Sequence, residues 1–139
     1  MPGETDQVKW RGVRPIDGIR GIWPSIDAVR VYRNGTLNGA GYSIFYTVPV
    51  GKILFISDSM LSSKLSADAA TFSYLIVRDA GAATKLYLYM FQFQIAGQQS
   101  VGTNYIVALE CQAGWTVSVR NSAANISSYG VFHGWLEDA

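Results

Sequence analysis

The chain has 139 residues, and only 15% of them are charged, against about 25% in an average soluble protein. Its formal net charge of +1 supplies no strong field for a nucleic acid or an acidic membrane surface, so we expect neither as a partner. The length fits one domain, and the single cysteine, Cys111, excludes an intrachain disulfide.

Residues 1–25 are predicted to form an extended N-terminal arm. They contain three of the four prolines and show no sustained apolar period. Indole and guanidinium groups dominate the energetics of many interfaces, so the arm would bind a partner through Trp10, Arg11, Arg14, Arg20 and Trp23. Two hypotheses remain open: the arm docks on a neighbouring molecule, or it folds back and caps its own domain.

Residues 26–139 are predicted to form one all-β domain. Runs rich in β-branched and aromatic residues alternate with turn residues at short intervals. No segment has a helical period, and loops are expected at 34–41 and 62–70. The pattern predicts a single β-sandwich or jelly roll of about eight antiparallel strands, at residues 26–33, 42–48, 53–61, 71–78, 85–94, 98–111 (one or two strands), 115–120 and 128–137.

The segment 85–94 is predicted to be a strand with two apolar faces. Strict alternation would place Leu86, Leu88 and Met90 on one face. The opposite face would carry Tyr87, Tyr89, Phe91 and Phe93. We interpret this face as the interface of an oligomer, and we expect that oligomer to be a homotrimer. The alternative is that a loop or the arm covers the second face.

Few residues have the spacing that catalysis or metal binding requires. His133 is the only histidine, and with Cys111 it falls short of the three or four nitrogen and sulfur ligands of a zinc site. The sequence lacks the nucleophile-elbow and phosphate-loop patterns. We expect His133 to be structural, Cys111 to be a small buried hydrophobe, and the protein to be no enzyme and to need no metal or cofactor. The internal carboxylates occur singly, at Asp58, Asp68, Asp79 and Glu110.

Three short motifs resemble virion proteins of tailed bacteriophages. Residues 46–52 read Y-T-V-P-V-G-K and precede the strand-like 53–56; in those proteins a strand ending in such a turn opens a small β-sandwich. The segments A-G-W-T-V at 113–117 and F-H-G-W-L-E at 132–137 are similar to its end. The resemblance covers roughly residues 42–137 and leaves out the arm.

This resemblance implies a structural protein of the virion, which is assembled in the host cytoplasm. The family includes head decoration (cement) proteins, head fibres and tail-associated modules, many of them trimeric. We expect an oligomeric capsid decoration protein that stabilises the shell, with its own copies and the major capsid protein or other virion proteins as partners. Several arms on one oligomer would raise the effective concentration at the shell. The alternative is a lectin-like module of a tail or fibre that binds host glycan.

Overall fold

The computed structural model describes residue 24 and residues 27–139. The described residues form eight strands and no helix, so none of them belongs to a helix that could cross a membrane. The predicted all-β class is confirmed. The strands are β1 (Val29–Asn38), β2 (Gly41–Thr47), β3 (Lys52–Leu65), β4 (Thr71–Arg78), β5 (Thr84–Phe93), β6 (Gly97–Cys111), β7 (Thr116–Asn121) and β8 (Ile126–Asp138).

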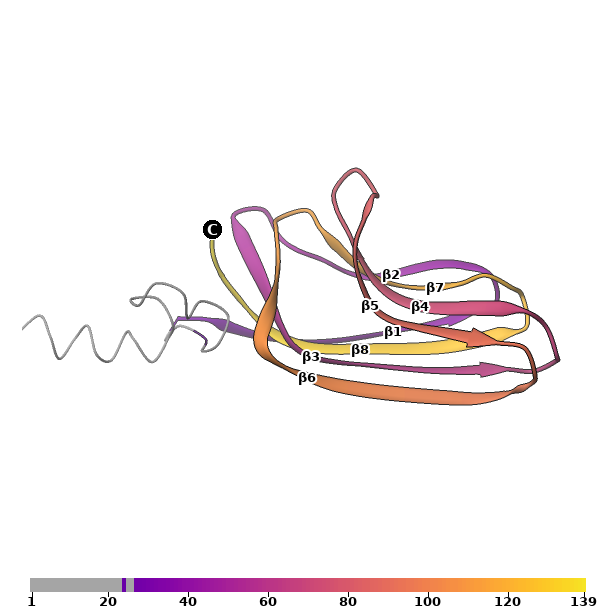
Figure 1. Ribbon diagram of the computed structural model, residues 1–139. Coiled ribbons are helices and arrows are strands. Elements are labelled where there is room, and N and C mark those ends of the chain that lie inside the picture. Colours follow the sequence, from indigo (N-terminus) through magenta and orange to yellow (C-terminus); the bar gives the residue numbers. More distant parts are fainter. Residues whose placement is uncertain (1–23, 25–26) are drawn as a thin grey trace, which may run out of the picture.

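Two four-stranded antiparallel sheets pack face to face (Figure 1). Sheet A has the strand order β1-β8-β3-β6, and sheet B has the order β2-β7-β4-β5. Nearly every connection crosses from one sheet to the other; β4 and β5 are the consecutive pair that stays in one sheet. This is the eight-stranded jelly roll, in which both sheets bury one apolar face and expose the other.

The core lies between the sheets and follows from the period-2 alternation of the strands. On β7, for example, Val117 and Val119 are buried where the alternating sequence predicts them. Each fully buried aliphatic or aromatic side chain contributes about 1.5–3 kcal/mol. The main cluster is completed by Val31, Val48, Leu54, Ile56, Leu61, Leu75, Val77, Cys111 and Phe132.

Two glycines of sheet A make room for side chains of sheet B. Gly35 on β1 pairs with Gly130 on β8. A Cβ atom at Gly35 would lie 2.5 Å from Cδ1 of Phe45, and one at Gly130 would lie 2.7 Å from Cγ2 of Val119. Both distances are far below van der Waals contact, so this close approach of the sheets requires the absence of a side chain at both positions.

Hydrogen-bonded side chains also cross the core. The hydroxyl of Ser73 on β4 lies 2.7 Å from that of Ser63 on β3 and 2.8 Å from that of Ser128 on β8. Ser128 donates to Oδ1 of Asn121 on β7 (2.6 Å), and Nδ2 of Asn121 donates to the carbonyls of Leu37, Gly39 and Ile126. The network satisfies polar groups that would otherwise be costly to bury.

The turn between β2 and β3 explains one motif of the sequence. The amide of Lys52 donates to the carbonyl of Pro49 at 3.2 Å, and Gly51 has φ +75°. Pro49 is thus the first residue of this turn and Gly51 the third, and the type II form requires positive φ at the third residue, which glycine adopts without strain. The P-V-G-K segment is therefore a reverse turn.

Two predicted loops are shorter than expected, because their first residues belong to strands. Residues 34–38 continue β1 and pair with Ser127 to Val131 of β8, and residues 62–65 continue β3. Asn34 and Gly35 are weak strand formers, but pairing along the full length of β8 outweighs this local preference. The loop at 34–41 shrinks to Gly39 and Ala40.

The strand ends define two poles of the jelly roll. Val29 at the start of β1 pairs with Leu136 near the end of β8, so these ends lie together at one pole (Figure 1). The loops at 39–40, 66–70, 94–96 and 122–125 lie at the other pole. There Asn125 donates to the carbonyl of Ala67, and Asp68 accepts from the amide of Ala96.

Candidate functional site

The predicted aromatic face of β5 is not one face in the structure. Tyr87 pairs with Ile76 and Tyr89 with Leu75, so the pairing has an irregularity at Leu88, where one extra residue breaks the alternation. Tyr87 is 59% exposed on the outer face of sheet B. The prediction that the four aromatic residues share one face of the strand is therefore wrong, because Tyr89 and Phe91 pack against the core and Phe93 is buried.

The other predicted residues have mixed outcomes. The arm residues Trp10, Arg11, Arg14, Arg20 and Trp23 lie outside the described residues. Cys111 is buried, as predicted, and burial raises the pKa of its thiol to about 12. Asp79 accepts hydrogen bonds from the amides of Gly81 and Ala83 and holds a tight turn.

A row of aromatic and basic side chains crosses the outer face of sheet B. Tyr42 on β2 pairs with Arg120 on β7, Arg120 with Tyr74 on β4, and Tyr74 with Met90 on β5. The guanidinium carbon of Arg120 lies 4.9 Å from the ring centre of Tyr42, and that of Arg78 lies 4.4 Å from the same ring. Two cations thus lie against one exposed aromatic ring.

Further aromatic rings extend this row. Phe72 stacks on Tyr74 with ring centres 6.0 Å apart, and Tyr87 lies 5.5 Å from Tyr74. Within the part of the chain that the structure describes, ion pairs join Lys52 to Asp138, Lys85 to Asp79 and His133 to Asp58. Arg78 and Arg120 take part in none of them. We call this surface the aromatic–arginine face: Tyr42, Phe72, Tyr74, Arg78, Tyr87, Met90 and Arg120.

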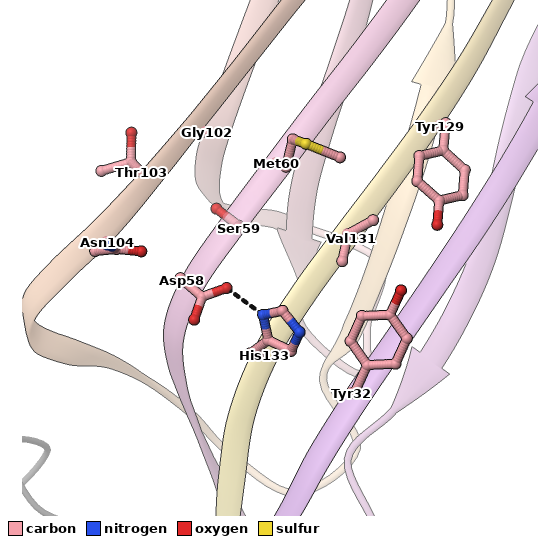
Figure 2. A pocket seen from close by; sticks show the side chains of 10 residues that line it. All are labelled: Tyr32, Asp58, Ser59, Met60, Gly102, Thr103, Asn104, Tyr129, Val131 and His133. Atoms are coloured by element: carbon pink, nitrogen blue, oxygen red, sulfur yellow. Dashed lines mark hydrogen bonds and ion pairs between the residues drawn. The ribbon is translucent and has the colours of Figure 1, made fainter.

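The outer face of sheet A has a different character. A depression of about 680 Å³ lies across its four strands. A register row of Tyr32, His133, Asp58 and Asn104 crosses β1, β8, β3 and β6 along one side of it (Figure 2). Nδ1 of His133 is paired with Oδ1 of Asp58, and the ring of Tyr32 stacks on the imidazole with centres 4.7 Å apart.

Sequence reasoning treated His133 and Asp58 as isolated residues and missed this site. The alternation of β8 does place His133 on the outer face. Nothing in the sequence specifies that β3 lies beside β8 with Asp58 opposite His133, after an irregularity between Ile56 and Asp58. Among the described residues, no group of three or more histidine, cysteine, aspartate or glutamate side chains could hold a metal ion.

Comparisons with known proteins give likeness of fold only. No protein-family model matches the chain, and no curated protein matches its sequence. Several solved structures are similar at low identity, and two come from bacteriophage capsids. A chain of the capsid of Helicobacter pylori bacteriophage KHP30 has a TM-score of 0.49 and 9% identity, covering 80% of this chain and 93% of that chain.

A chain of the cyanophage Pam1 capsid has a TM-score of 0.41 and 18% identity, covering 88% of this chain and 91% of that chain. A chain of the virus-like particle of extra small virus from the giant freshwater prawn Macrobrachium rosenbergii has a TM-score of 0.38 and 11% identity, covering 91% and 86%. All three TM-scores lie below 0.5, so we draw no conclusion about function from these likenesses.

Proposed function

We propose that the protein is a non-enzymatic structural component of a virion, specifically an oligomeric capsid decoration protein of a tailed bacteriophage. The observation that carries the proposal is the aromatic–arginine face, an exposed surface whose composition is that of a protein interface. The resemblance of residues 46–52, 113–117 and 132–137 to phage virion proteins supplies the biological context.

The composition of the aromatic–arginine face favours a protein partner. Tyrosine, arginine and methionine are enriched at interfaces, and tyrosine and arginine are also enriched among hot spots. Tyr87 and Met90 on β5 are 59% and 58% exposed, and Ile44 on β2, at the opposite edge of the same sheet, is 54% exposed. Ring and cation contacts already hold Tyr42 and Tyr74 in place, so little side-chain entropy would be lost when a partner binds.

A second exposed apolar patch lies on sheet A. Ile106 is 93% exposed and Val107 is 52% exposed on β6, the edge strand of that sheet. A ring of identical subunits joined head to tail needs two different complementary patches on each copy. We propose that the aromatic–arginine face of one subunit contacts the Ile106–Val107 patch of the next. Three subunits joined in this way would form a closed ring, a homotrimer.

The test is the molar mass of the protein in solution, measured by multi-angle light scattering. We expect a trimer for the wild type and a monomer for the double variant Tyr87→Lys, Met90→Lys. Ile106→Lys should have the same effect because it changes the other half of the contact. The matched control is Val50→Lys in the β2–β3 turn, where Val50 is 95% exposed. A monomeric wild type, or a trimer in all variants, contradicts the ring.

Attachment to the shell is assigned to the N-terminal arm. Trp10 and Arg14 are large anchors that suit an apolar pocket and a carboxylate on a capsid protein. The full-length variant Trp10→Ala, Arg14→Ala should keep its trimeric mass and lose co-sedimentation with capsid shells of the encoding virus. If it sediments with the shells as well as the wild type does, the arm is not the clamp.

A further inference from the structure

The outer face of sheet A carries a long groove that the assembly role does not use. Depressions of about 360, 680 and 280 Å³ follow one another along the strands. The first two share wall residues that include His133, and the second and third share Tyr129. Ser57 and Lys64 on β3 line its two ends, which corresponds to a length of roughly 20 Å at about 3.3 Å per residue.

The groove has an apolar floor between aromatic and polar walls. Val131 on β8 pairs with Met60 on β3, and Met60 pairs with Gly102 on β6, so these three positions form a floor across the strands. Gly102 has no side chain, which keeps the floor open toward β6. Tyr32 and Tyr129 rise on one side, and Asn104 lies on the other (Figure 2).

Contacts within the protein already hold the wall side chains in place. The imidazole of His133 is fixed by Asp58 on one side and by the stacked ring of Tyr32 on the other. A hydrogen bond to Tyr32 raises the pKa of the Tyr129 hydroxyl. Side chains fixed in this way lose little freedom when a ligand binds, which is a property of sites built for recognition.

The chemistry of the lining selects the class of ligand. The lining contains few acidic or basic side chains besides His133. Asp58 is paired with that histidine, and Arg30 and Lys64 lie toward the two ends of the groove. A nucleic acid backbone would need a row of cations, and an extended peptide would bind a strand edge rather than a sheet face. Most of the remaining polar lining consists of serine, threonine and asparagine.

We propose that this groove binds a linear, uncharged carbohydrate chain that lies along the strands. A pyranose ring has an apolar C–H face, which would stack on the ring of Tyr32, which is exposed, and on that of Tyr129, which is half-buried. Its rim of hydroxyl groups both donates and accepts, which matches Asp58, His133 and Asn104. The proposal goes beyond the assembly role and does not depend on it, because the groove lining contains no residue of the aromatic–arginine face or of the Ile106–Val107 patch.

The first experiment is electrophoresis of the full-length protein in native gels that contain a soluble polysaccharide. The neutral probes are dextran, arabinoxylan and galactomannan, and the charged comparison is alginate. We expect retardation by at least one neutral polymer. Calorimetric titration with the hexasaccharide of that polymer then gives the affinity per site, independently of the number of subunits.

Variants connect binding to the groove. Tyr32→Ala and Tyr129→Ala should each weaken binding of the hexasaccharide about tenfold, the loss expected for one stacking contact. Gly102→Leu, which fills the floor, should weaken it at least as much. The control is Val50→Ala, which shortens a side chain that is 95% exposed in the β2–β3 turn, outside the groove, and should leave the affinity per site unchanged. Circular dichroism checks that each variant is folded.

The outcomes separate this inference from the proposed function. Retardation by no neutral polymer, or by alginate alone, overturns it. Equal affinity in the wild type and in the folded Tyr32→Ala and Tyr129→Ala variants also overturns it. The assembly proposal fails instead through the mass of the Tyr87 and Met90 variants, so either proposal can fail while the other holds.

Discussion

Gly35 and Gly130 face each other on neighbouring strands of sheet A, and beside them the ring of Phe45 packs from sheet B. A Cβ atom at Gly130 would lie 2.7 Å from Val119 and 3.0 Å from Leu75, both of which are buried in the opposite sheet. The absence of side chains at Gly35 and Gly130 therefore allows the two sheets to lie this close together.

Gly130→Ala should lower the free energy of unfolding by about 1–3 kcal/mol, the usual cost of overpacking a core. Urea denaturation followed by tryptophan fluorescence measures it. Gly97→Ala is the control, because a Cβ atom there meets nothing within 4 Å, and its effect should stay within about 0.5 kcal/mol. Equal stability of the Gly130 variant and the wild type would show that the sheets can move apart freely.

Asn121→Ala should be more severe. The side-chain amide satisfies the carbonyls of Leu37, Gly39 and Ile126, and its oxygen accepts from Ser128. Buried groups left without partners cost about 1–3 kcal/mol each, so we expect a loss of about 3 kcal/mol in urea denaturation. Asn125→Ala, at a half-buried loop position whose one side-chain hydrogen bond, to the carbonyl of Ala67, is exposed, should change stability by less than about 1 kcal/mol. Similar losses in both variants would contradict the role of the network.

Cys111 should be inert in the folded protein. Its side chain is buried, and burial, with a smaller effect of Glu110, raises the pKa of the thiol to about 12. Because the thiolate is the reactive species, labelling with a maleimide at neutral pH should be at least about a hundredfold slower than in urea-unfolded protein. Mass spectrometry over time measures both rates. Rapid labelling under native conditions would mean that β6 opens readily.

Asp79 should make stability depend on pH in the acid range. Hydrogen bonds from the backbone, that of Ala83 above all, lower the pKa of its carboxyl group, and Lys85 adds to this. The stabilisation is complete above the pKa of the unfolded chain, roughly 4, and is lost as the pH falls through the lower pKa of the folded state. The melting temperature of the wild type should therefore exceed that of Asp79→Asn by less at pH 2 than at pH 6. A difference that stays constant with pH would show that the pKa of Asp79 is not lowered in the folded state.

Local patterns were sufficient to predict the class of fold but not its registers. The segment 115–120 was predicted to be a strand and forms most of β7, and the turn residues at 49–52 marked a real reverse turn. The alternation of β5 failed at Leu88, where the irregular pairing with β4 is a property of two strands together. The groove on sheet A needs four strands side by side, so no single segment of the sequence encodes it.

The pairing of Val29 with Leu136 matters for the choice of a position at which a second protein is fused to this one. A fluorescent protein or antigen fused after Ala139 would emerge at the same pole as Val29, the first residue of β1. Cargo inserted into a loop of the opposite pole, such as 122–125, would be displayed on the far side of the jelly roll, away from Val29 and Leu136.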